Sequence, residues 1–240
     1  MSDLSLITAA ILAGGLGTRL RSAVPDRQKI LAEVSGRPFI LYLLDQLSEA
    51  GVRHAVLCTG HWGEQVRETI GERHGDVRIE FSLEPEPQGT AGALRLALPR
   101  FRSDPVLAMN GDSYCRSDLR EFLGWHEKRA SEATLLLTRV PDTGRFGRVL
   151  VSDDGTIRRF EEKGGTRGSG WINAGVYLLG TRLLSEIPAA GFASLERDVF
   201  PRWTGKGLRG YRSAGRFIDI GTVESYREAE RFFPPRKDVG

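Results

Sequence analysis

Residues 10–20 combine an apolar run with closely spaced glycines and an arginine, in the order Ala-Ile-Leu-Ala-Gly-Gly-Leu-Gly-Thr-Arg-Leu. Glycine lets the backbone turn through positive φ and lets another group come close to its N–H groups. A row of such N–H groups forms a concave anion site, and phosphate is its usual ligand. The guanidinium of Arg19 at the end of the loop can pair bidentately with phosphate oxygens. We therefore predict a loop that binds a nucleoside triphosphate.

Two common phosphate-binding loops do not fit this stretch. A Walker A loop requires Gly, four intervening residues and then Gly-Lys-Ser/Thr, and the chain has no such run. The dinucleotide fingerprint G-x-G-x-x-G would start at Gly15 and Gly17, but its sixth position is Leu20. On this stretch alone, a strand-to-helix turn that needs glycine only for its shape stays an alternative.

Two further segments could contribute to a ligand site. Asp112 follows an apolar strand expected at 105–109, and open α/β sheets bind ligands at the carboxyl ends of their strands. The prolines within 84–94 force an extended lead, after which small residues are expected to open a helix. Small residues at a helix start allow a flat ring or a phosphate to approach closely.

The elements that position these residues alternate between strand and helix up to about residue 130, which predicts a mostly parallel sheet with right-handed crossovers. Strands are expected at 6–12, 30–34, 53–59, 77–83 and 105–109. Helices are expected from Pro38 to Gly51, at 62–73, after Gly89 and at 118–129. Strand-like segments at 134–140, 147–151, 157–162 and 171–179 predict an antiparallel insertion beside the cleft. Helices at 182–187 and 195–202, a strand at 207–211, the segment 217–222 and a helix ending near Phe233 complete the expected order.

Composition sets limits on the function. The 240 residues are 40% apolar and 27% charged, as in soluble globular proteins, and the net charge of +3 comes without long runs of one sign. We expect neither a nucleic-acid partner nor a membrane partner, and a cytoplasmic protein, because no secretory signal or ~18-residue apolar run is present. Cys58 and Cys115 lack zinc or disulfide spacing, and the four scattered histidines give no sign of a catalytic histidine.

The order of these motifs resembles the sugar-1-phosphate nucleotidyltransferase family, which makes NDP-sugars from an NTP and a sugar 1-phosphate. The opening L-A-G-G-x-G-T-R-L matches the family signature, and residues 29–38 match its second half. Further matches lie at 89–93, 110–112, 146–147, 161–163, 173–177 and 217–222. The chain departs from the family at Gln28 and Gly164, where proline is usual next to Lys29 and Lys163.

The resemblance implies a fold and a division of the chain. The fold would be α/β, with a Rossmann-like, mostly parallel mixed sheet flanked by helices and an antiparallel insertion on the sugar-binding side (the nucleotide-diphospho-sugar transferase fold). Residues 1–233 would form one domain. Its nucleotide-binding part would span about 1–130, its sugar-phosphate-binding part about 131–221, and its C-terminal helix 222–233. The tail 234–240 would be loose, and the protein a monomer or homodimer.

The resemblance also implies roles on the triphosphate side. Arg19 would hold the departing phosphates, and Lys29 would offset charge near the transferring phosphoryl group. Asp112 and Asp219 would share one Mg²⁺, the expected cofactor. Candidate nucleotide-binding residues are Leu12, Ala13, Gly14, Gly15, Gly17, Thr18, Glu84, Gly89, Thr90 and Asp112.

The matches on the sugar-phosphate side are Gly147, Glu162, Lys163 and Asn173. A glutamate can accept hydrogen bonds from sugar hydroxyls, and a lysine supplies a point charge for the phosphate. Glu161 is expected to face outward, because successive strand residues face opposite ways. Asn173 could instead be a turn or ladder-end residue.

Glu84 is the residue that bears on the choice of base. Relatives that use UTP or dTTP tend to carry glutamine there. A carboxylate only accepts hydrogen bonds, and guanine offers two adjacent donors, N1–H and N2–H₂. This favours GTP, with the alternative that Glu84 faces solvent from a polar turn.

Among guanylyltransferases, the compact length and residues 37–39, 194–198 and 217–222 look most like those that use D-glycero-α-D-manno-heptose 1-phosphate. Mannose-1-phosphate guanylyltransferases are near neighbours. A UTP- or dTTP-dependent glucose-1-phosphate nucleotidyltransferase stays open, as does a non-catalytic NDP-sugar-binding regulatory subunit. A metal-dependent glycosyltransferase of related topology is a further alternative, although its diphosphate donor would not need the glycine loop with Arg19 and Lys29.

Overall fold

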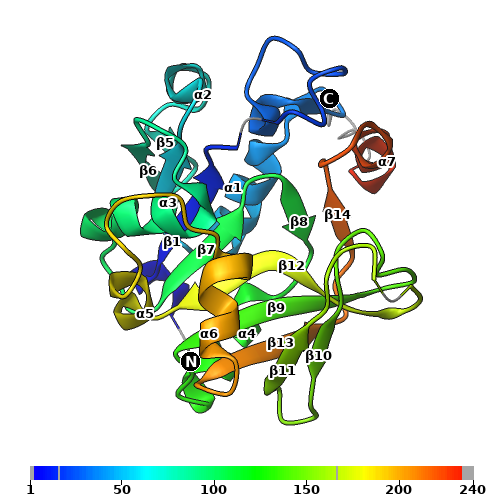
Figure 1. Cartoon of the computed structure of the whole chain (residues 1–240). Coiled ribbons are helices and arrows are strands. Elements are labelled where there is room, and N and C mark those ends of the chain that lie inside the picture. The colour runs from blue at the N-terminus through cyan, green and yellow to red at the C-terminus, as the bar shows by residue number, and fades with distance from the viewer. Residues whose placement is uncertain (1–2, 16, 166, 234–240) are drawn as a thin grey trace.

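A mixed sheet forms the centre of the computed structural model, which describes residues 3–15, 17–165 and 167–233 (Figure 1). Its strands are β1 (Thr8–Ala13), β4 (His54–Thr59), β5 (Arg73–His74), β6 (Val77–Leu83), β7 (Val106–Asn110), β9 (Ala133–Val140), β12 (Gly170–Leu179) and β13 (Leu208–Ser213). Within the described ranges the strand order is β13-β9-β12-β7-β1-β4-β6-β5. The four strands β7, β1, β4 and β6 are parallel, whereas β12 runs antiparallel to both β7 and β9.

Helices cover both faces of this sheet. They are α1 (Ile40–Ala50), α2 (Gly63–Ile70), α3 (Gly89–Ala97), α4 (Leu119–Lys128), α5 (Thr181–Ser185), α6 (Phe200–Trp203) and α7 (Val223–Phe232). Alternate residues of β1 pack into different cores, because successive strand side chains point to opposite faces. Ile11 packs into the core that includes Leu43 of α1, and Ala10 packs into the core that includes Leu94 of α3. The predicted α/β architecture is confirmed.

The strands expected in the antiparallel insertion are divided between the main sheet and a separate two-stranded pair. Strands β9, β12 and β13 extend the main sheet, and β10 (Val149–Val151) and β11 (Ile157–Phe160) pair separately (Figure 1). A further short pair joins β8 (Ser113–Cys115) to β14 (Phe217–Asp219). The sequence did not indicate β8, which is only three residues long.

Several local predictions are wrong. A 3-10 turn occupies Lys29–Leu31, and only Glu33–Val34 (β2) of the expected strand 30–34 pairs with Arg37–Pro38 (β3). Ser35 and Gly36 have φ of 49° and 76°, the positive values of a tight hairpin turn. Pro38 is therefore in a strand, and α1 begins at Ile40.

The predicted helix 195–202 is a π-helical turn, Leu195–Val199, followed by α6. The predicted loose tail 234–240 lies outside the described residues.

Candidate active site

Three of the predicted nucleotide-binding residues lie where the parallel strands end. Gly14 follows β1, Glu84 follows β6, and Asp112 comes two residues after β7. Backbone bonds hold these ends together, because Glu84 N donates to Thr59 O at 2.7 Å and Gly111 N donates to Leu12 O at 2.9 Å. Carboxyl ends of parallel strands meet at one edge, so segments distant in sequence form one surface.

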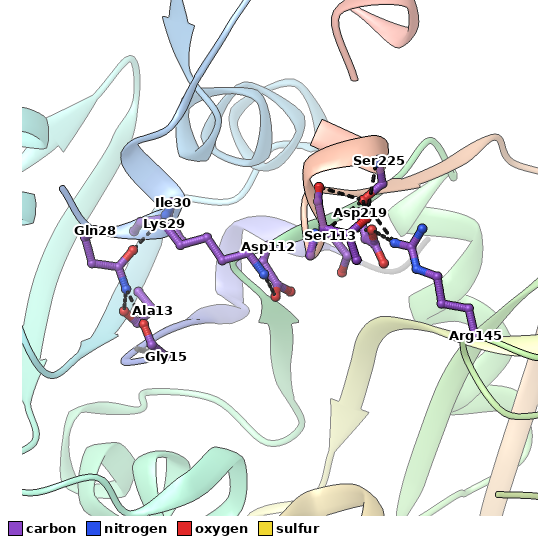
Figure 2. Close-up of polar contacts among 12 residues, drawn as sticks. Ala13, Gly15, Gln28, Lys29, Ile30, Asp112, Ser113, Arg145, Asp219 and Ser225 are labelled. Carbon is purple, nitrogen blue, oxygen red and sulfur yellow. Dashed lines mark hydrogen bonds and ion pairs between the residues drawn. The ribbon is translucent and has the colours of Figure 1, made fainter. Parts of the chain in front are cut away.

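The glycine loop is held by Gln28, the residue that replaces the usual proline. The Gln28 side chain is 5% exposed, and its Nε2 donates to Ala13 O and, at 3.2 Å, to Gly15 O (Figure 2). Its Oε1 accepts from Ile30 N at 2.7 Å. The amide therefore ties the start of the loop to the turn that carries Lys29. The replacement of proline by Gln28 did not indicate this contact in the sequence.

Lys29 lies between the loop and the first aspartate. A Cβ on Gly17, which has φ of 61°, would come 3.2 Å from Lys29 Cβ, so the loop packs directly on this side chain. Lys29 Nζ is 2.5 Å from Asp112 Oδ2 (Figure 2). The lysine side chain is 10% exposed and that of Asp112 is 42% exposed. A nearly buried cation thus holds a carboxylate that stays accessible to a ligand.

The loop residues differ in exposure. Gly15, Thr18 and Arg19 are exposed, whereas Leu12, Gly14 and Gly17 are partly buried and Ala13 is buried. A hollow beside the loop is lined by Gly15, Gly17, Arg21, Lys29 and His61, among others. Arg19 is not part of that lining. Its exposed guanidinium can be reached from solvent.

Asp219 lies beside Asp112 across the β8–β14 pair. Asp219 is opposite Ser113 in the register, and Ile220 N donates to Asp112 O at 2.9 Å. The carboxylate of Asp219 accepts from Arg145 Nη2, which also donates to Ser225 Oγ at 3.0 Å (Figure 2). Arg145 was not among the predicted residues. Its position just before the matched Phe146-Gly147 is the sequence signal that could have indicated it.

The two aspartates fit a magnesium ion by donor chemistry. Carboxylate oxygens are hard ligands, and Mg²⁺ takes few protein oxygens and leaves places for water and phosphate. In the part of the chain that the structure describes, no group of three or more His, Cys, Asp or Glu side chains could hold a metal. Asp112 and Asp219 are the side chains that could hold such an ion.

Glu84 points inward, so the solvent-facing alternative is wrong. The residue is 8% exposed, and its Oε2 accepts from Gln88 N at 2.9 Å, just before α3. The other oxygen, Oε1, lies against Gly14, where a Cβ would collide with it. Burial raises the pKa of Glu84 above its usual value, and the bond from Gln88 N opposes that rise. An accepting group therefore stands between the glycine loop and the start of α3.

Gly89 and Thr90 form the start of α3. Gly89 has φ of 74°, and a Cβ there would come 2.5 Å from Ala193 O. Glycine is required at this position both for the backbone angle and for the close approach of the 193 segment. Thr90 Oγ1 accepts from Leu195 N at 2.8 Å.

On the sugar-phosphate side, Gly147 packs on the turn that carries Glu162 and Lys163. Gly147 has φ of 81°, and a Cβ there would come 2.6 Å from Glu161 O and 3.7 Å from Lys163 N. Glu162 and Lys163 are exposed. The outward orientation expected for Glu161 is wrong, since its side chain is 16% exposed and pairs with Arg159 at 2.9 Å. Strand β11 ends at Phe160, so strand alternation no longer applies there.

Asn173 lies at an irregularity of β12. The pairing of β12 with β9 shifts register between Asn173 and Tyr177. Asn173 Oδ1 accepts from Gly175 N at 2.9 Å, and its Nδ2 donates to Tyr177 Oη at 2.9 Å. Ser113 Oγ donates to Ala174 O at 3.3 Å, so the bulged segment packs on the strand that follows Asp112. The structure thereby brings the segment of Asn173 next to the aspartates.

Helices in the described ranges are all too short or too polar to cross a bilayer.

Comparisons with known proteins give a consistent picture. The family model described as "Nucleotidyl transferase" matches residues 8–235. A D-glycero-alpha-D-manno-heptose 1-phosphate guanylyltransferase of Aneurinibacillus thermoaerophilus is 34% identical over 93% of this chain and 96% of its own length. A mannose-1-phosphate guanylyltransferase of Mycobacterium tuberculosis is 31% identical over 92% of this chain, which spans 62% of that longer relative.

Two solved structures have the same fold as this chain. HddC from Yersinia pseudotuberculosis, in a crystal structure described as complexed with GMP-PN, superposes with a TM-score of 0.84 at 30% identity, covering 95% of this chain and 99% of HddC. A putative glucose-1-phosphate thymidylyltransferase from Bacillus anthracis gives a TM-score of 0.82 at 25% identity, covering 94% of each chain. The predicted nucleotide-diphospho-sugar transferase fold is confirmed by these neighbours.

Proposed function

Because the chain belongs to the nucleotidyl transferase family and is a sugar-1-phosphate nucleotidyltransferase, we propose that it joins GTP to a sugar 1-phosphate and releases pyrophosphate. The best candidate for the sugar is D-glycero-α-D-manno-heptose 1-phosphate. The relative of similar length from Aneurinibacillus thermoaerophilus carries that name, and the motifs at 37–39, 194–198 and 217–222 support it.

The observation that carries the choice of GTP is the buried carboxylate of Glu84 at the ligand-binding edge. Its Oε2 is already committed to Gln88 N, and Oε1 faces Gly14 at the loop. A group that can only accept suits the adjacent N1–H and N2–H₂ donors of guanine. The same carboxylate would repel the O4 carbonyl of uracil or thymine.

The reaction is an in-line attack by a phosphate oxygen of the sugar 1-phosphate on the α-phosphorus of GTP. The bond from the α-phosphorus to the bridging oxygen breaks, and pyrophosphate leaves with the electron pair. Positioning and charge neutralisation carry such a transfer, because the protein does little covalent chemistry. The loop backbone would hold the triphosphate, and exposed Arg19 would bind the departing phosphates.

Lys29 and the aspartates would act at the transferring group. Lys29 Nζ, held 2.5 Å from Asp112 Oδ2, would neutralise charge that develops on the phosphoryl oxygens. Asp112 and Asp219 would hold Mg²⁺. When bound, that ion supplies Lewis-acid stabilisation of phosphate oxygens. Lys163 would bind the sugar phosphate and Glu162 and Asn173 the hydroxyls, with Gly147 allowing the turn to approach.

A panel assay tests the proposal. Pyrophosphate release is measured with GTP, ATP, UTP and dTTP, each against D-glycero-α-D-manno-heptose 1-phosphate, mannose 1-phosphate and glucose 1-phosphate. We expect the highest kcat/KM for GTP with the heptose phosphate. A preference for mannose 1-phosphate would move the assignment to the activity named for the mycobacterial relative.

Turnover only with UTP or dTTP would overturn the guanine assignment. The absence of turnover with every pair, together with tight GDP-sugar binding, would instead favour a regulatory subunit.

A further inference from the structure

A carboxylate outside the predicted site connects its two sides. Glu196 lies in the π-helical turn Leu195–Val199. Its Oε2 accepts from Ser194 Oγ at 3.0 Å and from Thr90 Oγ1 at 3.3 Å, and its Oε1 accepts from Tyr177 Oη at 3.1 Å. One partly buried carboxylate therefore holds three hydroxyl groups from separate parts of the chain.

One limb of this network reaches the nucleotide side. Besides the bond from its hydroxyl to Glu196, Thr90 Oγ1 accepts from Leu195 N at 2.8 Å. Ala91 N donates to Ala193 O at 2.9 Å, and Ala193 N donates to Gln88 O at 2.8 Å. The first turn of α3 is thus fastened to the 193–196 segment. Thr90 is therefore bonded both to the Glu196 carboxylate and to the backbone of Leu195.

The other limb reaches the sugar-phosphate side. Tyr177 is fully buried on β12, and its ring packs against Phe200 with centroids 5.4 Å apart. Burial and the nearby Glu196 carboxylate raise the pKa of Tyr177 well above its usual value, so the phenol stays protonated and donates to Glu196. The phenol oxygen then accepts from Asn173 Nδ2 at 2.9 Å. Asn173 is fixed from both ends, because its Oδ1 is bound to Gly175 N.

We propose that Glu196 is a positioning residue that holds Thr90 with one carboxylate oxygen and, through Tyr177, Asn173 with the other. The inference rests on the proposed function, in which Thr90 binds the nucleotide and Asn173 the sugar phosphate. Removing Glu196 takes one hydrogen-bond partner from Thr90 and leaves Tyr177, the partner of Asn173, without its acceptor, whereas removing the Tyr177 hydroxyl takes a partner from Asn173 and leaves the Thr90–Glu196 bond in place. The KM for GTP therefore tests the Thr90 branch of the network, and the KM for the sugar phosphate tests the Asn173 branch.

The test compares Glu196→Ala, Glu196→Gln and Tyr177→Phe, with Glu228→Ala on the exposed face of α7 as the control. We expect Glu196→Ala to raise the KM for GTP and for the sugar phosphate about tenfold each, the effect of losing hydrogen bonds to a charged group. Glu196→Gln should restore most of both, because its amide keeps an acceptor for Tyr177 and the hydroxyls of Thr90 and Ser194 can turn to accept.

Tyr177→Phe separates positioning from general destabilisation. It should raise the KM for the sugar phosphate about fivefold to tenfold and leave the KM for GTP within about twofold. Unchanged KM values in Glu196→Ala, or equal rises for both substrates in Tyr177→Phe, would overturn the proposal. If Glu196→Ala fails to fold, Tyr177→Phe still gives the split between the two substrates.

The wild-type panel distinguishes failure of this network from failure of the proposed function. If the wild type uses another NTP, the guanine assignment fails, and the variants are compared with that NTP instead. If the wild type turns over with none, binding of GTP and of mannose 1-phosphate is titrated separately by calorimetry. The same pattern of rises is then expected in Kd, and unchanged Kd values would overturn the role of Glu196.

Discussion

Replacing Glu84 with glutamine tests base recognition with almost no change in shape. Gln88 N requires an acceptor 2.9 Å away, so the glutamine oxygen takes the place of Oε2. Its NH₂ group must then occupy the position of Oε1 beside Gly14. If Glu84 binds guanine as proposed, the variant places a donor where the wild type has an acceptor for the two guanine donors.

The expected effect follows from hydrogen bonds to a charged acceptor, which are worth about 1.5–3 kcal/mol each. Since 1.4 kcal/mol is a factor of about ten, kcat/KM for GTP should fall about 10-fold to 100-fold in Glu84→Gln. Selectivity should shift toward UTP and dTTP, whose O4 accepts from the new NH₂ group. The assay is pyrophosphate release with each NTP at a fixed sugar phosphate. Glu86→Gln, exposed in the same segment, is the matched control.

The pH dependence gives an independent check of the same side chain. Burial raises the pKa of Glu84 above its ordinary value of 4.5, so the folded state binds this proton more tightly than the unfolded state. The protonated carboxyl group therefore stabilises the folded state fully below pH 4.5, and this stabilisation is lost as pH rises through the raised pKa. The proposed recognition of guanine needs the ionised form, so GTP affinity should rise over the same pH window.

Glu84→Gln removes both dependences. The Tm of the variant relative to the wild type should increase as pH rises above 4.5. Over the same pH range the KM for GTP should fall in the wild type and stay constant in the variant. Unchanged base selectivity in Glu84→Gln, or a wild-type KM for GTP that improves as pH falls, would refute the reasoning about Glu84.

Three further substitutions, the first with a matched control, test the loop and the second aspartate. Gly14→Ala places a Cβ against a buried carboxylate and should lower the free energy of unfolding by about 1–3 kcal/mol, with roughly 2–4 °C of Tm lost per kcal/mol. In the control Gly15→Ala, the new Cβ meets nothing within 4 Å, and Tm should be unchanged in thermal scans. Equal shifts for the two would contradict this. Gln28→Ala removes the clamp on the loop and should raise the KM for GTP about tenfold in the panel assay; an unchanged KM would mean that the loop keeps its shape without the amide. Arg145→Gln removes the cation from Asp219 and should tighten Mn²⁺ binding severalfold, measured by electron paramagnetic resonance without nucleotide, and weaker binding would show that Arg145 supports the metal site.

The sequence predicted the positions of strand ends better than the contacts of side chains. Apolar runs bounded by glycine and proline marked β1, β4, β6 and β7, and parallel topology then required Gly14, Glu84 and Asp112 to share one edge. Short elements were less predictable. The pair β8–β14, which sets Asp219 beside Asp112, depends on a partner about 100 residues away, and three residues carry no periodicity of their own.

Side-chain contacts of long, flexible residues could not be derived in the same way. Arg145 could have faced solvent on its loop, and only the packing of that loop on the turn after β11 brings its guanidinium to Asp219. Glu196 likewise lies in a π-helical turn, where helical spacing does not state which face a residue occupies. Tertiary contacts decide both cases.

Gln28 departs from the family pattern but keeps the backbone conformation that the usual proline would impose. Proline at this position would restrict φ to about −65°, and Gln28 already has φ of −63°. The glutamine therefore adopts the backbone that proline would impose, but three side-chain hydrogen bonds to the loop and to Ile30 N maintain it. These hydrogen bonds restrain the loop directly. The rigidity of the proposed triphosphate loop consequently depends on the carbonyls of Ala13 and Gly15, which a proline ring at position 28 would leave without this donor.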